Sequence, residues 1–300
     1  MTERYQATMG DIVEKLTEGY GLIEGPVWHN ERGLLFSDVQ AGGVYAVTDQ
    51  GLVSTIFEHR RGIGGIALHS NGEGLIVSGR NIAYKPFDGG STIELHSQAP
   101  GNAAVGFNDI TTDGAGRVYA GELGGSPFDE TSGTPSDLWM LDLDGSAHAV
   151  GHDVLLTNGL GFSPDGRILY HSDSLRSAVM KYAVHDDGRL GPKQHFADMV
   201  RGHPDGLVVS EDGAVWVALA SGGSGVGVYN PDGSVRAHID IPLPMCTSVC
   251  FGGADLRQLY IVSGSQGAES DRAGAVFVTD SDVAGLVVSP ALVPLGCSRR

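Results

Sequence analysis

Side chains that carry oxygen recur at widely spaced but matching positions along the chain. Each position begins a segment of one layout: an apolar stretch, a turn about seven residues on, and a β-branched or aromatic stretch. The six first positions are Glu24, Gly64, Asn108, Asn158, Asp205 and Ser248. Two carboxylates and two carboxamides at one site suit a hard divalent cation, which also removes the repulsion between the carboxylates.

The spacing indicates which elements must bring these residues together. The segments start 40 to 50 residues apart, which is the length of one four-stranded propeller blade. Asx-Gly pairs typical of hairpin turns follow the first strand of three segments, as at Asp165-Gly166 and Asp212-Gly213. We therefore predict an all-β, six-bladed β-propeller in one domain over residues 1–300, closed by a strand from residues 1–20. A two-sheet sandwich is the alternative, but near-even repeats favour radial closure.

In a propeller, equivalent positions form a ring around the central channel, so the first residues of the segments would converge at its mouth. Each residue also has an ordinary interpretation. Asn158 and Asp205 precede glycine and could form turns, although another Asp-Gly follows each pair seven residues later. Glu24 could be a solvated loop acid, and Asn108 could form an Asx turn. Their shared register favours a common site.

The same segments show a family resemblance. The sequences EGPVWHNERGLLFSD from Glu24, TNGLGFSPDGRILYHSDS from Thr157 and HPDGLVVSEDGAVWVA from His203 resemble the family of senescence marker protein 30, gluconolactonase and luciferin-regenerating enzyme. The resemblance runs from about residue 20 to residue 280. It implies a six-bladed propeller that hydrolyses lactones of sugar acids, or related esters, with one divalent metal in the channel.

The resemblance also implies roles for individual residues. The metal ligands are expected to be Glu24, Asn158 and Asp205, and Asn108 is expected to contact the substrate. Ca²⁺ is the metal we favour, with Zn²⁺, Mn²⁺, Mg²⁺ and Fe²⁺ as alternatives, because residue identity alone does not select among them. Asp205, as a carboxylate beside the metal, is the catalytic residue expected to accept a proton from the attacking water.

One position departs from the family pattern. Aldonolactonases of the family commonly carry an arginine two residues before the substrate-contacting asparagine, where this chain has Gly106. Losing a guanidinium removes up to five donors and opens space, which favours a bulkier or less polar lactone over a strongly hydroxylated aldonolactone. Glu122 is either a replacement substrate contact or a surface acid at a strand end. His171 and His203 could lie at the mouth as proton shuttles or metal-proximal residues, or could be ordinary histidines of loops or strand ends.

Other function classes stay open or are excluded. The same metal site could serve other esters, phosphoesters or a non-hydrolytic step, or the chain could be a non-enzymatic calcium-binding propeller. The 36 acidic residues outnumber the 19 lysines and arginines, giving a net charge of −17, which argues against nucleic-acid and anionic-lipid partners. A small-molecule lactone or ester is the expected partner.

The remaining features concern the compartment. No signal-peptide pattern and no apolar run near 20 residues is found, so we expect a cytoplasmic protein without a membrane partner. Cys246 and Cys250 lack a second pair of ligands nearby and are interpreted as small buried hydrophobic residues.

Overall fold

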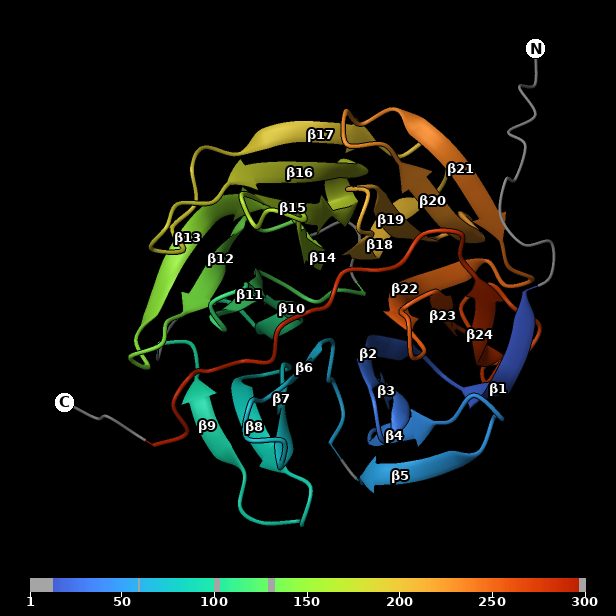
Figure 1. Ribbon diagram of the computed structural model, residues 1–300, viewed down its shortest axis with the longest axis horizontal. Helices are drawn as coiled ribbons and strands as arrows, with labels where there is room; N and C mark the ends of the chain where they lie inside the picture. The colour runs from blue at the N-terminus through green and yellow to red at the C-terminus, as the bar shows by residue number, and fades with distance from the viewer. Residues whose placement is uncertain (1–12, 59, 100–102, 129–132, 297–300) are drawn as a thin grey trace.

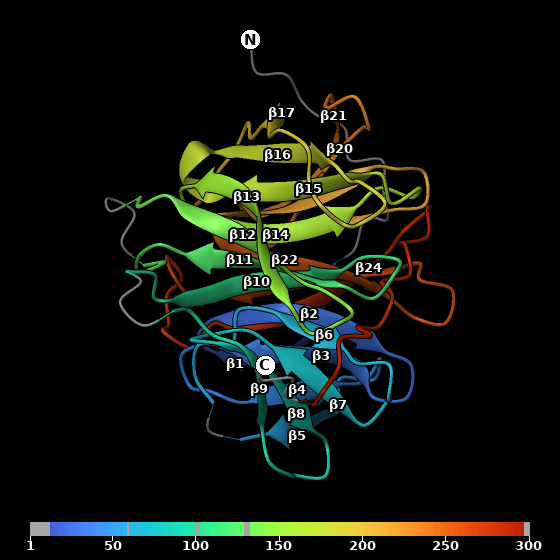
Figure 2. The same cartoon turned by 90° about the vertical axis from the view of Figure 1, so that its left-hand side faces the viewer.

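The computed structural model describes residues 13–58, 60–99, 103–128 and 133–296. Within these residues, strands form six four-stranded antiparallel sheets arranged radially around a central channel (Figure 1). This arrangement confirms the predicted all-β, six-bladed β-propeller. In the perpendicular view, strands of neighbouring blades lie one above another around the rim (Figure 2).

Five blades each use four consecutive strands. Blades one and two contain β2 (Ile23–His29), β3 (Gly33–Asp38), β4 (Val44–Val47) and β5 (Val53–Phe57), then β6 (Ile66–Leu68), β7 (Gly74–Val77), β8 (Ile82–Pro86) and β9 (Ile93–His96). Blades three and four contain β10 (Gly106–Thr112), β11 (Val118–Leu123), β12 (Ser136–Leu141) and β13 (Ala147–Val154), then β14 (Thr157–Phe162), β15 (Ile168–Asp173), β16 (Ala178–Ala183) and β17 (Gln194–Asp198). Blade five contains β18 (His203–Val209), β19 (Val215–Ala220), β20 (Gly225–Tyr229) and β21 (Val235–Asp240).

The sixth blade joins the two ends of the chain. It contains β22 (Met245–Gly252), β23 (Gln258–Gly264) and β24 (Gly274–Asp280), and β1 (Glu14–Tyr20) pairs antiparallel with β24 as the outer strand. Residues 1–12 of the segment expected to close the ring lie outside the described residues. The single domain over residues 1–300 stays a prediction.

The Asx-Gly pairs divide into turns and strand residues, as their spacing indicated. Gly213 has a φ of +82°, a conformation that glycine adopts without a Cβ clash, and its N–H donates to Ser210 O between β18 and β19. Asn158 and Asp205 instead lie inside β14 and β18. Asn158 and Asp205 are therefore residues of the innermost strands of their blades and not turn residues.

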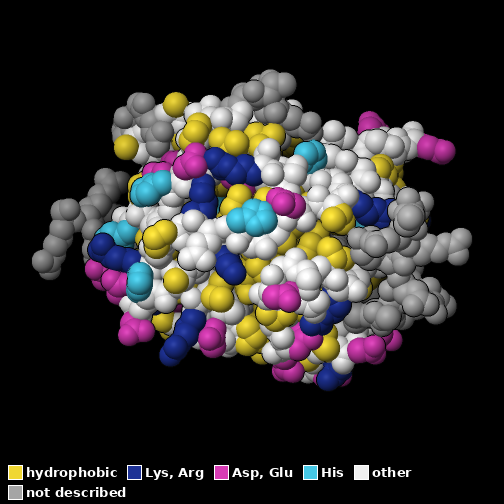
Figure 3. All heavy atoms as spheres, turned by 90° about the horizontal axis from the view of Figure 1, so that it is seen from above, with side chains coloured by type: hydrophobic (Ala, Val, Ile, Leu, Met, Phe, Trp, Pro, Cys, Tyr) yellow, Lys and Arg dark blue, Asp and Glu magenta, His cyan; other side chains and the backbone are white. Residues whose placement is uncertain are grey.

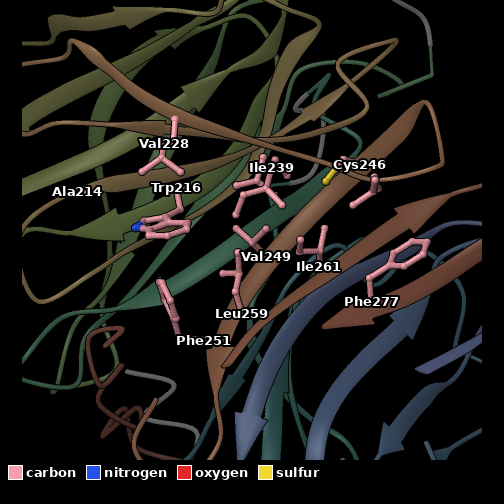
Figure 4. Packing of buried hydrophobic residues seen from close by; sticks show 14 of the residues in the cluster. Ala214, Trp216, Val228, Ile239, Cys246, Val249, Phe251, Leu259, Ile261 and Phe277 are labelled. Atoms are coloured by element: carbon pink, nitrogen blue, oxygen red, sulfur yellow. The ribbon is translucent and has the colours of Figure 1, made fainter. Parts of the chain in front are cut away.

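The core lies between blades, where apolar faces of adjacent sheets meet. Figure 4 shows the cluster between blades five and six, in which Trp216 and Phe251 make an edge-to-face contact with ring centroids 5.2 Å apart. Cys246 belongs to this cluster and is fully buried, and Cys250 is also buried, as interpreted from the sequence. The innermost strands are thus packed against neighbouring blades around the channel.

After β24 the chain crosses one end of the channel (Figure 1, red). We call residues 285–293 the strap. Its backbone exchanges hydrogen bonds with three blades: Leu286 N donates to Val209 O, Ala291 N to Leu68 O and Leu292 N to Gly116 O. In the described part of the chain no helix is long and apolar enough to cross a bilayer.

Candidate functional site at the end of the channel

Four of the five predicted site residues lie on innermost strands at the same end of the channel, opposite the strap. Glu24, Asn108, Asn158 and Asp205 occupy the first three positions of β2, β10, β14 and β18, the innermost strands of four blades. The strap contacts the other ends of these strands, at residues such as Thr112 and Val209.

A backbone irregularity accompanies each of these residues. The register of the innermost strand against its neighbour shifts between Glu24 and Val27, between Phe107 and Ile110, between Thr157 and Leu160, and between Pro204 and Leu207. Such bulges bend a strand and redirect side chains that regular alternation would place on opposite faces. The bulges therefore turn polar groups of four blades towards one place.

The bulge in β10 brings in a residue that sequence reasoning did not assign to the site. Asp109 lies beside Asn108 and is buried near Glu24 and Asp205, whose carboxyl groups its charge perturbs. Strict alternation along β10 would have separated Asn108 from Asp109, and only the bulge places both at the channel. We call Glu24, Asn108, Asp109, Asn158 and Asp205 the acid–amide ring.

The three carboxyl groups of the ring share an unfavourable environment. Glu24, Asp109 and Asp205 are 8%, 8% and 5% exposed, and each has a buried oxygen (Oε2, Oδ2 and Oδ1) without a hydrogen-bond partner among the described residues. Burial, followed by the neighbouring carboxylates, raises the pKa of Glu24 and of Asp205 well above the ordinary range. Burial raises the pKa of Asp109 to about 7.

The two carboxamides are held by hydrogen bonds. Asn108 Nδ2 donates to Asn158 Oδ1 at 2.6 Å and to the carbonyl of Thr157 at 2.9 Å. Asn158 Nδ2 donates to Ser174 Oγ at 2.7 Å, in the short 3-10 turn η1 (Ser174–Arg176). A Cβ at Gly64 would collide with Asn108 Oδ1, so the glycine in the second blade leaves room for this oxygen.

One of the two histidines is not where we expected it. His171 is 1% exposed and lies behind β14, with Nε2 2.7 Å from Thr157 Oγ1, and burial lowers its pKa to about 4. A proton shuttle must reach solvent or substrate, so the placement of His171 at the mouth is wrong. His203 Nδ1 lies 3.0 Å from Ser174 O and 2.9 Å from Ser177 Oγ, so this side chain supports the turn that holds Asn158.

Glu122 lies on β11 and is only 4% exposed, so its interpretation as a surface acid is wrong. Its Oε2 accepts a hydrogen bond from Asp137 N at 3.3 Å, and its backbone carbonyl accepts one from Ser136 Oγ. The strand pairing of β10 with β11 places Glu122 opposite Phe107, next to the ring.

A cavity of about 920 Å³ occupies the strap end of the channel. It is lined mainly by apolar residues of the innermost strands and by strap residues 286–290, and it reaches the ring at Asp109. Glu24, Asn158 and Asp205 do not line it. The channel therefore has a polar end and a largely apolar end.

The chemistry of the ring fits a divalent cation. Buried carboxyl oxygens without partners are costly, and a hard cation that takes oxygen ligands offsets this cost. The described residues contain no three His, Cys, Asp or Glu side chains grouped so as to hold a metal ion by themselves. The carboxamide oxygen of Asn158, in addition to Glu24 and Asp205, would therefore be needed to complete the ligand set.

The fold and site define a six-bladed propeller with buried acids and amides at one end of its channel. Residues 22–265 match the family model described as the SMP-30/gluconolactonase/LRE-like region, and the chain belongs to this family.

Individual relatives agree with this assignment. The 6-deoxy-6-sulfogluconolactonase of Pseudomonas putida is 34% identical over 276 residues, which cover 88% of this chain and 92% of the relative. A pentonolactonase of Haloferax volcanii is 31% identical over 278 residues, with the same shares covered. Among solved structures, a luciferin-regenerating enzyme superimposes with a TM-score of 0.85 at 23% identity, covering 94% of this chain and 99% of that one. The relatives support the enzyme class expected from the sequence, a lactonase-type hydrolase.

Proposed function

We propose that this protein is a divalent-metal-dependent hydrolase that opens the ring of a lactone. The observation that carries the proposal is a set of three buried carboxyl oxygens that have no hydrogen-bond partner among the described residues and lie at one end of the channel beside two ordered carboxamides.

Four of the five ring residues have a role in this proposal. Glu24, Asn158 and Asp205 hold the cation, and Ca²⁺ is favoured because it accepts several oxygen ligands in irregular geometry. When bound, the cation polarises the ester carbonyl and balances the negative charge of the site. Positive charge nearby favours the ionised form of Asp205, which a proton acceptor requires.

Hydrolysis adds one water molecule across the ester bond of the lactone. Water adds its oxygen to the acyl carbon as the acyl carbon–ring oxygen bond breaks. Asp205 takes a proton from the water and passes it to the ring oxygen, which becomes a hydroxyl group. Asn108 orients the substrate by hydrogen bonds. The product is an open hydroxy acid, which releases one proton at neutral pH.

The substrate is proposed to depend less on hydroxyl contacts than an aldonolactone does, because Gly106 supplies no guanidinium donors. The structure does not bear out the open space that we expected there. A Cβ at Gly106 would lie 2.6 Å from Gly79 O and 3.2 Å from Arg80 Cα, so the loop of the second blade fills the position. The cytoplasmic location also stays a prediction.

The test follows acid release from a panel of γ- and δ-lactones, including gluconolactone and pentonolactones, with a chelator or with added Ca²⁺. We expect hydrolysis that is lost on chelation and restored by the cation. Undiminished hydrolysis after complete chelation would overturn the metal requirement. A protein that binds the cation but hydrolyses no lactone, ester or phosphotriester would instead be a calcium-binding propeller.

A further inference from the structure

The cavity at the strap end has no role in the proposed hydrolysis, because Glu24, Asn158 and Asp205 do not line it. Its volume of about 920 Å³ is that of a small-molecule site, since such sites measure about 300–1,000 Å³. A mainly apolar wall offers water few hydrogen-bond partners, whereas an apolar ligand gains free energy by leaving water for it. The cavity therefore suits an organic molecule.

The inner end of the cavity lies next to the ring, where neighbouring innermost strands are close together. In four blades the second residue of the repeat is glycine, and a Cβ there would lie 3.0 Å or less from an atom of the next blade. These residues are Gly25, Gly65, Gly159 and Gly206. The third blade has Asp109 at this position, so a carboxyl group occupies the inner end of the cavity.

The described residues that line the cavity include four acids and no lysine or arginine. Three of these acids are solvated or paired. Glu31 is exposed, Asp113 pairs with Arg117 at 3.0 Å, and Asp165 accepts a hydrogen bond from Ser163 Oγ at 2.7 Å. On the side of the molecule seen in Figure 3, by contrast, basic side chains lie next to acidic ones.

The fourth acid of the lining, Asp109, is neither solvated nor paired. It is buried, and its Oδ2 has no hydrogen-bond partner among the described residues. The carboxylates of Glu24, Asp109 and Asp205 carry three negative charges, and the divalent cation of the proposed function supplies two positive ones. One negative charge remains, and Asp109 is the ring carboxyl that a molecule in the cavity can reach.

The outer end of the cavity is apolar. Val287 and Val288 of the strap both line the cavity and are exposed to solvent. A ligand that enters beside the strap therefore contacts apolar side chains first and meets the carboxyl group of Asp109 at the inner end.

We infer that the strap-end cavity binds a small organic cation, whose apolar body fills the cavity and whose single amino group pairs with Asp109. This inference goes beyond the proposed function and rests on it only for the charge that the metal leaves on the ring. An ammonium group suits the inner end because it is compact and can donate three hydrogen bonds. The net charge of −17 attracts cations at long range, and the lining offers an anion no basic partner.

The experiment compares three probes that share one apolar body. At pH 7, 1-naphthylmethylamine is a cation, 1-naphthylmethanol is its uncharged analogue and 1-naphthoate is an anion. Calorimetric titration into the Ca²⁺-loaded protein measures the Kd of each probe. We expect the amine to bind about tenfold or more tightly than the alcohol, because a hydrogen bond to a charged group is stronger than one between neutral groups. The naphthoate should bind most weakly.

Asp109→Asn removes the charge at the inner end and keeps the shape of the side chain. The Kd of the amine should rise to within about threefold of the Kd of the alcohol. Asp165→Asn is the matched control, because Asp165 lines the same cavity but has a partner within the protein. It should keep the preference for the amine. An unchanged melting temperature shows that each variant folds.

A second measurement locates the site without a change to the acid. In Cys297→Ser protein the two other cysteines, Cys246 and Cys250, are buried. A pyrenyl maleimide coupled to Val287→Cys, at the opening of the cavity, should weaken binding of the amine by about tenfold or more. The same label on Leu52→Cys, an exposed position of the first blade outside the lining, should not.

Each outcome decides one part of the inference. Binding of none of the probes, or unchanged binding of the amine to the protein labelled at position 287, would overturn the site. Equal or tighter binding of the alcohol or the naphthoate would overturn the cationic class of the ligand. A preference that Asp109→Asn retains would overturn the pairing with Asp109.

The failure of this inference can be distinguished from the failure of the proposed function. Displacement of the amine by Ca²⁺ would show that the amine occupies the ring instead of the cavity and would overturn the inference, while the metal site stands. Hydrolysis of no lactone would overturn the proposed function, while binding of the amine at the strap end would stand.

Discussion

The two ends of the channel differ in polarity and in how their buried polar groups are paired. At the ring end, carboxyl and amide groups are buried and three carboxyl oxygens lack partners among the described residues. At the strap end, a cavity of about 920 Å³ is lined mainly by apolar side chains, and the strap satisfies backbone groups of three blades. Asp109 touches both regions, since it belongs to the ring and lines the inner end of the cavity.

The two ends differ in whether their buried polar groups have hydrogen-bond partners. Hydrogen bonds at the strap end follow the ordinary rule that buried polar backbone groups are paired. The ring end violates this rule at several side chains within a few residues of strand bulges. Local departures of this kind concentrate at functional sites, where a ligand completes the environment. Substitutions at the two ends should therefore have different effects on kcat and on the free energy of unfolding.

The largest expected effect is on catalysis at the ring end. Asp205→Asn removes the proton acceptor and one carboxylate ligand, so kcat for lactone hydrolysis should fall by roughly 10³-fold or more. The measurement is acid release at saturating Ca²⁺.

Asp165→Asn makes the same chemical change at the strap end, where Asp165 lines the cavity and accepts a hydrogen bond from Ser163 Oγ. It should retain the parental kcat. A similar loss of kcat in both variants would contradict the assignment of the chemistry to the ring end.

The second prediction concerns the buried histidine behind the ring. The pKa of His171 is lowered to about 4 when folded, against about 6.5 when unfolded, so the unfolded chain binds a proton first. The stability associated with neutral His171 is fully present above pH 6.5 and is lost as the pH falls towards 4, by roughly 3 kcal/mol.

Denaturant unfolding between pH 7 and pH 4 measures this loss, with His171→Asn as the comparison. The variant should lose less free energy of unfolding over that range than the parent does. Parallel curves for both proteins would show that His171 does not remain neutral in the folded state.

The third prediction isolates the carboxylate repulsion at the ring. In chelated protein at pH 8, Glu24→Gln should raise the free energy of unfolding by about 1–3 kcal/mol, because an amide replaces a carboxyl group whose ionisation burial opposes. In excess Ca²⁺ the order should reverse, since the variant lacks a ligand for the cation.

Thermal unfolding with chelator and with Ca²⁺ gives both values. A variant that is less stable than the parent under both conditions would indicate that Glu24 is a structural acid and that its oxygens have partners.

The smallest effect is expected at the strap. Thr112 is buried and its Oγ1 donates to Ser289 O, so Thr112→Val removes one hydrogen bond that ties the strap to β10. The free energy of unfolding should fall by about 1 kcal/mol without a change in kcat. A marked fall in kcat would mean that the strap end takes part in catalysis and would remove the distinction between the two ends.

The sequence predicted features that repeat and missed features that depend on contacts between blades. Asp165-Gly166 and Asp212-Gly213 were identified as hairpin turns from local chemistry, and the repeat register brought Glu24, Asn158 and Asp205 to one end of the channel. Asp109 was missed because a bulge, which has no signature in this sequence, cancels the alternation of β10.

Two further errors have the same origin. The space expected at Gly106 is filled by Gly79 and Arg80, which lie 26 or more residues earlier in the chain but adjacent in the fold. His171 was expected at the mouth, yet its strand position turns it inwards beneath Thr157. Neither packing relation can be obtained from a single repeat.

The most direct test of the account is the calorimetric titration of Ca²⁺ into chelated protein. We predict that one ion binds per chain, that Asp205→Asn loses this binding, and that Asp165→Asn retains it. Binding of the same stoichiometry and affinity in Asp205→Asn, or no binding to the parent protein by Ca²⁺ or by any other divalent cation, would contradict the claim that the acid–amide ring is a metal site.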